Sequence, residues 1–149
     1  MSTRNSRYRI LVSDREKNTR DAVAEIFSDA GYSVDAAGSG SETIEMLTRQ
    51  SYDLIFCDLD LPKKSGFEIV RMARALNRDA RIVVTSAQGE PVNRTRIRRE
   101  GAFDVLDKPL RRATLLAAAR NALRGTATAI SDAAVLAGTD GERGGTGPA

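Results

Sequence analysis

Short apolar runs alternate with longer amphipathic segments along most of this chain, and this alternation constrains the fold more than any other feature. The runs are brief, lack regular polar interruptions and are rich in β-branched or aromatic residues; they cover 8–12, 32–36, 54–57, 82–84 and 103–106. Apolar runs of this length are typical of strands that are covered on both faces, as the strands of parallel sheets are.

The segments between the runs carry apolar residues at helical spacing. The first of them presents Val23 and Phe27 on one face and is followed by Gly31, a residue that commonly ends helices. We expect a second helix to begin at Ser41 and a third to follow Ser65. A fourth helix should span 91–100 with a stop at Gly101, and the last should end at Gly125. Five repeats of strand and helix predict an α/β fold, a doubly wound and open five-stranded parallel sheet with helices on both faces.

Polar side chains follow four of the five runs, at the point where each predicted strand ends. Asp14 follows the first run, Asp58 the third, Ser86 the fourth and Lys108 the fifth. The carboxyl ends of parallel strands lie on one edge of the sheet, where ligands of such folds bind. We therefore expect these four side chains and Arg15 to share one small pocket.

A carboxylate that lies beside a hydroxyl and an ammonium group allows a narrow range of chemistry. The carboxylate of Asp58 can act as a nucleophile toward phosphorus and form an acyl phosphate. The hydroxyl of Ser86 and the ammonium of Lys108 can bind the added phosphoryl oxygens. The structural alternative is a buried ion pair between Asp58 and Lys108, with Ser86 as a capping residue.

Four segments resemble the receiver domain of bacterial two-component response regulators, the CheY-like family. They are RILVSDREKN, YDLIFCDLDLPKKSGFEIVR, IVVTSAQGE and GAFDVLDKPL, in the order and spacing of that family. The resemblance covers about residues 7–124. It implies a flavodoxin-like fold in which Asp58 is the phosphoacceptor, Ser86 the switch hydroxyl and Lys108 the lysine of the site. It also implies a cis peptide bond between Lys108 and Pro109.

The residue after Asp14 departs from the pattern of the family. Receivers usually have two adjacent acids here, the second of which binds Mg²⁺ directly, whereas this chain has Arg15. The resemblance leaves Asp14, Asp58 and the backbone carbonyl of Asp60 as metal ligands, with the Asp60 side chain pointing outward. Asp14, Asp58, Arg15 and Lys108 together carry a net charge near zero, and a guanidinium can sit between the two carboxylates. We therefore expect weak or absent Mg²⁺ binding, unless Arg15 turns into solvent.

Val105 is a second departure, on the fifth predicted strand. The family commonly has tyrosine or phenylalanine here, an aromatic side chain that swings inward when the hydroxyl residue moves. Valine cannot act in this way, and Phe103 shares its strand face but lies nearer the strand's start. Switching would then depend more on the loop at Ser86 and on the arginine-rich helix at 91–100.

These features predict a single-domain response regulator rather than an enzyme. About two dozen residues follow Arg124, too few for a DNA-binding module. Asp58 would accept a phosphoryl group from a histidine kinase or phosphotransfer protein, and a face at 91–124 would bind a target protein. One alternative is a pseudo-receiver, a protein-binding module in which Arg15 imitates the metal or neutralises Asp58 permanently. A remote alternative is a phosphatase of the haloacid dehalogenase type, because Asp58 and Asp60 form an Asp-x-Asp pair.

Composition narrows the partners and the location. The hydrophobic content of 41% and the charged content of 29% fit one soluble domain, without a run that could span a membrane. Cys57 is the only cysteine, which excludes an internal disulfide, and the N-terminus lacks a secretory signal. We therefore expect a cytoplasmic protein.

Charge and sequence complexity vary along the chain. Arginines gather at 94–99 and at 111–112. They form either solvated helix faces or a docking surface for an acidic protein partner; nucleic acid is less favoured, because no aromatic residue is interleaved with them. The last two predicted helices are candidate faces for a homodimer. We divide the chain into an N-terminal extension at 1–6, a receiver domain at 7–125 and a flexible Gly/Ala/Thr-rich tail at 126–149, with scope for a short helix at 131–136.

Overall fold

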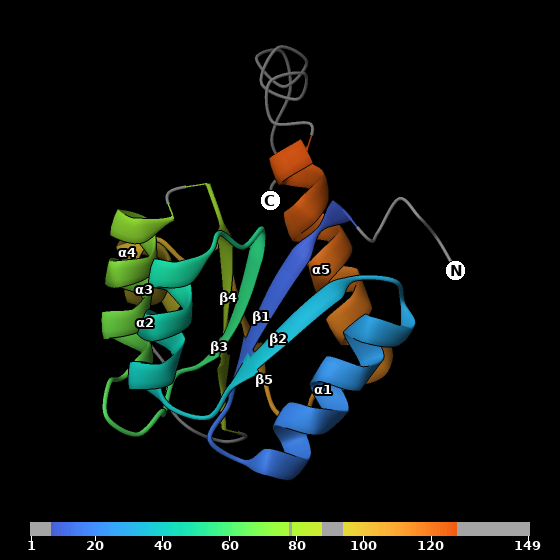
Figure 1. The fold of residues 1–149 in the computed structure, drawn as a ribbon, viewed down its shortest axis with the longest axis horizontal. Helices are drawn as coiled ribbons and strands as arrows, with labels where there is room; N and C mark the ends of the chain where they lie inside the picture. The colour runs from blue at the N-terminus through green and yellow to red at the C-terminus, as the bar shows by residue number, and fades with distance from the viewer. Residues whose placement is uncertain (1–6, 78, 88–93, 128–149) are drawn as a thin grey trace.

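A computed structural model of the chain describes residues 7–77, 79–87 and 94–127. Strand and helix alternate five times along it, as the sequence predicts (Figure 1). The elements are β1 (Arg9–Ser13), α1 (Lys17–Asp29), β2 (Ser33–Ala37), α2 (Gly40–Arg49), β3 (Leu54–Asp58), α3 (Gly66–Leu76), β4 (Arg81–Ser86), α4 (Arg94–Glu100), β5 (Asp104–Asp107) and α5 (Arg112–Ala127).

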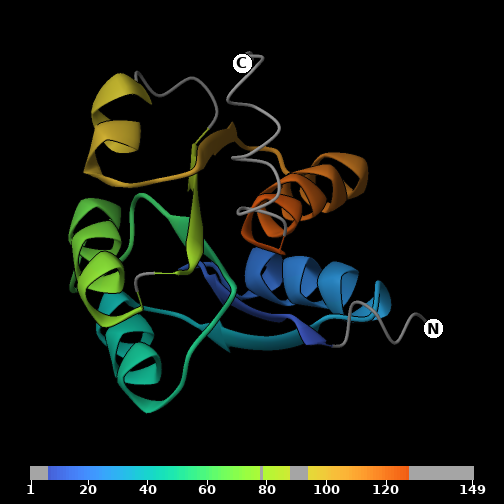
Figure 2. The same ribbon diagram turned by 90° about the horizontal axis from the view of Figure 1, so that it is seen from above.

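The five strands form one parallel sheet in the order β2-β1-β3-β4-β5. Ile10 of β1 pairs with Val34 of β2 on one side and with Leu54 of β3 on the other. Helices α1 and α5 cover one face of the sheet, and α2, α3 and α4 cover the other (Figure 2). The chain winds outward in opposite directions from β1 and β3, so the loops after these two strands diverge and leave a crevice at the carboxyl edge.

The sheet separates two clusters of buried apolar side chains. Successive residues of a strand point to opposite faces, so Ile10 belongs to the cluster under α1 and α5 and Leu11 to the cluster under α2, α3 and α4. Phe27 of α1 packs on Phe56 with ring centroids 5.0 Å apart. Ile10 and Leu11 are both fully buried, although they point to opposite faces of the sheet. Burial on both faces explains why the central strands appear in the sequence as continuous apolar runs.

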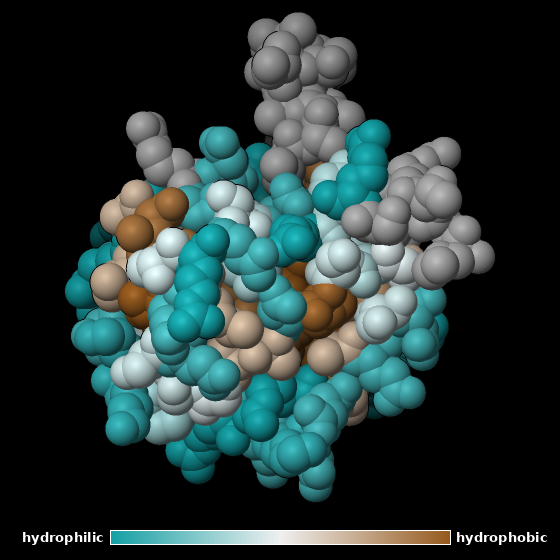
Figure 3. Space-filling view, viewed as in Figure 1, coloured by the Kyte–Doolittle hydropathy of each residue, from teal (hydrophilic) through white to brown (hydrophobic). Residues whose placement is uncertain are grey.

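The edge strand β2 is less buried than the strands inside the sheet. Ser33 is exposed and only Ala37 is fully buried among its five residues. Figure 3 shows a mostly hydrophilic surface on this side of the molecule, with apolar atoms near the middle of the view and at its left edge. Asp35 places a charged residue in β2, a common protection of edge strands against pairing with other chains.

Every strand runs at least one residue further than the sequence predicts. The predicted ends at 12, 36, 57, 84 and 106 become Ser13, Ala37, Asp58, Ser86 and Asp107. The prediction followed the apolar runs, but the ladder continues because Ser13, Asp58 and Ser86 are themselves buried, at 2%, 5% and 2% exposure. The polar residues at the carboxyl edge therefore belong to the strands and share their rigidity.

The helix boundaries differ from the predictions in two places. Helix α2 begins at Gly40 rather than Ser41, because Ser39 is the N-cap and its Oγ accepts a hydrogen bond from the Glu42 N–H at 3.1 Å. Helix α5 passes through Gly125 and ends at Ala127. The predicted stops at Gly31 and Gly101 are confirmed, since both have the positive φ that favours glycine after a helix.

Several predictions fall outside the described residues. They concern the extension at 1–6, the start of the fourth helix at 91–93, and the tail from 128 onward with its possible helix at 131–136. Within the part of the chain that the structure describes, every helix is too short or too polar to cross a membrane.

Candidate functional site

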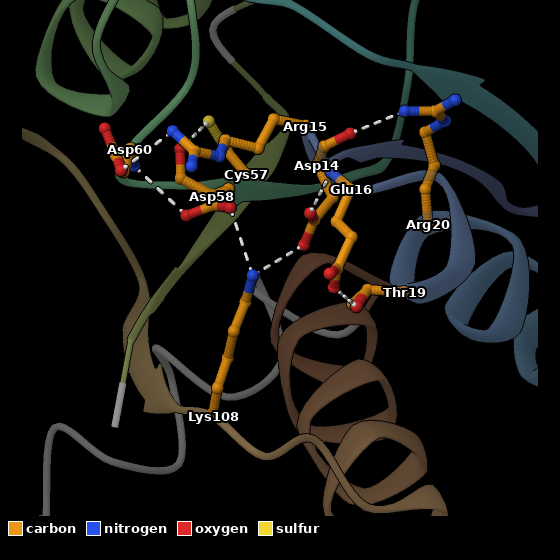
Figure 4. A network of polar contacts seen from close by, with 9 residues as sticks. All are labelled: Asp14, Arg15, Glu16, Thr19, Arg20, Cys57, Asp58, Asp60 and Lys108. Atoms are coloured by element: carbon orange, nitrogen blue, oxygen red, sulfur yellow. Dashed lines mark hydrogen bonds and ion pairs between the residues drawn. The ribbon is translucent and has the colours of Figure 1, made fainter. Parts of the chain in front are cut away.

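Asp14, Asp58 and Lys108 meet at the carboxyl edge of the sheet (Figure 4). Asp58 is the last residue of β3, Asp14 follows β1 and Lys108 follows β5. The Lys108 Nζ donates hydrogen bonds to Asp14 Oδ2 at 2.8 Å and to Asp58 Oδ2 at 3.1 Å. The two carboxylate side chains are only 5% and 7% exposed. The predicted cis bond between Lys108 and Pro109 is also confirmed.

Asp14 and Asp58 share the single positive charge of Lys108, so the negative charge of the Asp58 carboxylate is only partly balanced. Burial raises the pKa of Asp58, and the Asp60 N–H at 3.1 Å and Lys108 lower it without offsetting the burial. For Lys108, burial favours the neutral amine, but the hydrogen bonds to the two carboxylates outweigh it and raise the pKa of the ammonium. Lys108 is thus firmly charged, while Asp58 is a carboxylate held in an unfavourable environment.

Arg15 does not lie between the two carboxylates; its side chain turns toward solvent, the alternative that the sequence left open. Lys108 occupies the position between the carboxylates, because it reaches the gap from β5 and its compact ammonium binds both of them. The Arg15 Nη1 lies instead 3.4 Å from Asp60 Oδ2, and the two side chains are 60% and 84% exposed. The outward orientation predicted for the Asp60 side chain is confirmed.

A cavity of about 400 Å³ opens above these groups. Its lining consists of Asp14, Arg15, Glu16, Asp58, Asp60, Ala87 and Lys108. Four carboxylates and two cations give this lining a net charge of −2, not the near-zero value expected from four residues. Glu16, however, is turned toward α1, where its carboxylate accepts a hydrogen bond from Thr19 at 2.5 Å.

The hydroxyl of Ser86 is directed to a residue that the sequence interpretation missed. Ser86 ends β4 and is the register partner of Asp107 at the end of β5. Its Oγ lies 3.2 Å from Asp107 Oδ1, to which it donates, and the next residue, Ala87, lines the cavity in its place. Ser86 is therefore not among the residues that line the cavity in this conformation. The signal was present: Asp107 is the carboxylate directly before Lys108 on a neighbouring strand.

The loop after Asp58 is packed tightly against α3. A Cβ added to Gly66 would lie 2.6 Å from Leu59 Cα and 3.1 Å from the Asp58 carbonyl oxygen, so only glycine fits here. The Leu59 N–H also donates to the Thr85 carbonyl at 2.8 Å, and the Gly66 N–H donates to Leu59 at 2.8 Å. These contacts fix the backbone that carries the Asp58 carboxylate.

The aromatic side chain that receivers commonly carry on the fifth strand has no equivalent in β5. Val105 is 3% exposed and packs under α4. Phe103 lies one residue before β5, is 38% exposed, and stacks against the Arg81 guanidinium at 5.4 Å. Phe103 therefore lies outside β5 and outside the buried core that contains Val105.

Although Arg15 turns outward, two features of this edge weigh against Mg²⁺, and weak or absent binding stays a prediction. The ion favours six oxygen ligands in octahedral geometry, including one or two carboxylates. Here Lys108 already binds an oxygen of Asp14 and one of Asp58, and Arg15 brings a positive charge to the rim. Among residues 7–77, 79–87 and 94–127, no group of three acidic, histidine or cysteine side chains is arranged to hold a metal ion.

A parallel β2-β1-β3-β4-β5 sheet with two carboxylates and a lysine at its carboxyl edge is the arrangement of a receiver domain. A family model for the response regulator receiver domain matches residues 10–120. The chain therefore belongs to the receiver domain family of response regulators, which act in two-component signalling, and the resemblance found in the sequence is confirmed.

Known proteins support the same assignment. The chain is 35% identical over 122 residues to the transcriptional regulatory protein CusR of Escherichia coli (strain K12), covering 82% of this chain and 54% of that protein. It is 35% identical over 118 residues to the response regulator MprA of Mycobacterium leprae (strain TN), covering 79% of this chain and 52% of MprA. The chain thus spans about half the length of these relatives.

Solved structures confirm the fold. A response regulator receiver domain protein from Clostridium thermocellum superposes with a TM-score of 0.76 and 27% identity, covering 82% of this chain and 98% of that one. The chemotaxis response regulator CheY4 of Vibrio cholerae superposes with a TM-score of 0.72 and 27% identity, covering 78% and 98% of the two chains.

Proposed function

We propose that Asp58 accepts a phosphoryl group from the phosphohistidine of a histidine kinase or phosphotransfer protein. The observation that carries this proposal is a rigidly held, poorly compensated carboxylate that opens into a cavity beside a charged lysine. An Asp58 oxygen attacks phosphorus, the phosphorus–nitrogen bond of the donor breaks, and its electron pair stays on the imidazole. The protein turns over no external substrate; it becomes phosphorylated and returns to the carboxylate by hydrolysis.

The signal would leave through contacts with another protein. The proposed face comprises α4, β5 and α5, the described part of the segment 91–124. Two arginines of α4 that we expected to meet a partner already have partners within the chain: Arg94 pairs with Asp107 at 2.8 Å and Arg98 with Asp104 at 2.9 Å. Positive charge on this face is therefore better supplied by the exposed Arg111 and Arg112, at the start of α5.

A groove between β5 and α5 gives this face a shape that a partner can fill. It is lined by small residues of α5, among them Ala113, Ala117 and Ala118, with Asp104 and Leu106 on the β5 side. We propose a protein rather than a nucleic acid as the partner, a cytoplasmic setting for the exchange, and a homodimer through α4 and α5 as one form of the contact.

Mass measurement after treatment with a small phosphodonor tests the phosphoacceptor. Acetyl phosphate should add one phosphoryl group to the wild-type chain and none to Asp58→Asn, because the amide is not a nucleophile toward phosphorus. The matched control is Asp60→Asn, which removes an exposed carboxylate from the same cavity and should still be phosphorylated.

The pseudo-receiver interpretation makes the opposite prediction. A wild-type chain that stays unmodified with acetyl phosphate and with a histidine kinase, and that binds its partner equally well as Asp58→Asn, would establish a fixed binding module. The haloacid dehalogenase interpretation requires steady release of phosphate from an aryl phosphate, which the present proposal excludes.

A further inference from the structure

We propose that Arg15 binds the phosphoryl group on Asp58 and thereby replaces a divalent metal in the phosphorylation reaction. This inference rests on the proposed function and concerns how the same site manages charge. It starts from two findings: Arg15 stands on the rim of the cavity, and Lys108 already binds one oxygen of each of the carboxylates that would otherwise hold Mg²⁺.

The charge of the site calls for a second cation once Asp58 is phosphorylated. A phosphoryl group carries about −1.5 to −2 near pH 7 and replaces a carboxylate of −1. Lys108 already shares its single charge between Asp14 and Asp58. Of the residues that line the cavity, Arg15 is the other cation. Without its help, the added charge would be buried beside the Asp14 carboxylate.

Arg15 can reach this role at small energetic expense. Its present contact is an exposed ion pair with Asp60, a kind of pair that contributes about 0–1 kcal/mol. Asp60 lies two residues after Asp58, and Figure 4 shows the Arg15 side chain extending toward it along the rim of the site. A guanidinium binds phosphoryl oxygens with two parallel hydrogen bonds. Arg15 would therefore form a stronger and better oriented contact with the phosphoryl group than its present ion pair with Asp60.

The test compares phosphorylation with Mg²⁺ and with a chelator, using the full chain and acetyl phosphate. In this reaction an Asp58 oxygen bonds to phosphorus, the bond from phosphorus to the acetyl oxygen breaks, and acetate leaves with the electron pair. The wild-type chain should be phosphorylated equally fast in both conditions. Arg15→Gln should react about tenfold more slowly or worse in both, since one charge-assisted contact to the phosphoryl group is lost.

Two variants sharpen the comparison. Arg15→Asp restores an acid to the rim, so it should react slowly with the chelator and recover with Mg²⁺; isothermal titration should detect Mg²⁺ binding to this variant and not to the wild type. Lys17→Gln is the matched control, because it removes a positive charge two positions away in an exposed pair with Asp21, outside the cavity. It should behave as wild type.

The outcomes separate this inference from the proposed function. An acceleration of the wild type by Mg²⁺ of about tenfold or more, or an Arg15→Gln variant as fast as wild type, overturns the role of Arg15 and leaves Asp58 as the phosphoacceptor. A wild-type chain that stays unmodified in both conditions overturns both.

A different observation supports a second inference, which also rests on the proposed function. The Asp107 carboxylate joins the switch hydroxyl to helix α4: its Oδ1 lies 3.2 Å from Ser86 Oγ and its Oδ2 lies 2.8 Å from Arg94 Nη2. The same guanidinium donates through Nη1 to the Val105 carbonyl at 2.8 Å. One carboxylate thus holds both the end of β4 and the first described residue of α4.

We infer that Asp107 competes with the phosphoryl group for the Ser86 hydroxyl. A hydroxyl has one proton to donate, so Ser86 cannot donate to Asp107 and to a phosphoryl oxygen at once. The contact with Asp107 therefore belongs to the unphosphorylated state, and its loss removes one of the bonds that position the Asp107 carboxylate for Arg94 of α4. This link can transmit the change at Asp58 to α4. Such a link is needed here because β5 carries Val105 in place of the aromatic residue that commonly moves in receivers.

Amide hydrogen exchange across residues 94–100 tests the link. Phosphorylation should raise exchange in α4 of the wild type, whereas Asp107→Ala should raise it beforehand and leave little further response. Asp104→Ala is the matched control. Asp104 pairs with Arg98 of the same helix, and its described hydrogen bonds are to Arg98 and to the Val105 N–H rather than to Ser86. The exchange of α4 in this variant should still rise on phosphorylation. An equal response in wild type and Asp107→Ala overturns the inference.

Discussion

Replacing Lys108 by methionine is expected to lower the free energy of unfolding by about 3 kcal/mol near pH 7, the lower end of the range for breaking a buried ion pair. Methionine retains the length and apolar stem of the side chain but leaves Asp14 and Asp58, both nearly buried, without the cation that they share. The lower end applies because the Lys108 side chain is 23% exposed, so water relieves part of the unpaired charge.

The deficit of the methionine variant should depend on pH. Burial already raises the pKa of Asp58 and Lys108 lowers it, so removing the lysine raises it further. A group with a raised pKa in the folded state stabilises the fold at low pH and loses that contribution as pH rises through this pKa. The deficit should therefore shrink as pH falls from 7 toward 5, as urea unfolding at the two values would show.

Lys17→Met provides the control for the loss of a lysine. Lys17 pairs with Asp21 one helical turn away, at 2.6 Å, and both side chains are exposed. We expect a change of less than about 1 kcal/mol at either pH. A Lys108→Met variant as stable as this control, or one with the same deficit at both pH values, would contradict the account of the site given above.

Asp58→Asn is expected to lose phosphorylation completely and yet to be more stable than the wild type near pH 7, by about 1 kcal/mol. The carboxylate of Asp58 is unfavourable in the folded state, because burial raises its pKa above the ordinary 3.8 in spite of Lys108. Asparagine carries no charge, and its carbonyl can still accept the Asp60 N–H. The reactive carboxylate thus reduces stability in exchange for function.

The sign of this effect fixes its pH dependence. Below pH 3.8 the wild-type carboxyl is protonated in the folded and unfolded states, so the advantage of asparagine should vanish there and grow as pH rises. Thermal unfolding of both chains across this range is the measurement. Asp60→Asn, at an exposed carboxylate, should match the wild type throughout. An Asp58→Asn variant that is less stable near pH 7 would contradict the prediction.

The fold was accessible from the sequence because its main signals are local. Apolar runs covered on both faces, helical stripes such as that of Val23 and Phe27, and stops at Gly31 and Gly101 each depend on a few neighbouring residues. Parallel alternation then brings Asp14, Asp58 and Lys108 to one edge by topology alone, and the structure places a single ammonium group within 3.1 Å of both carboxylates.

Side-chain directions at the site were not accessible in the same way. Arg15 and Ser86 stand where the sequence places them along the chain, but their contacts with Asp60 and Asp107 are set by competition among groups from four different strands. A long arginine and a freely rotating hydroxyl adopt whichever partner the surroundings favour. Strand ends were missed for a related reason: burial of polar residues such as Ser13 depends on tertiary packing.

The separation of the interior by the sheet bears on how this protein can change over time. Phe27 of α1 and Ile97 of α4 belong to different apolar clusters, one on each face of the sheet. Substitutions on opposite sides should then combine additively, since distant and independent sites do so. Mutations can thus accumulate beneath α1 and α5 without compensation beneath α4, so the two helical layers of the molecule are free to evolve at different rates.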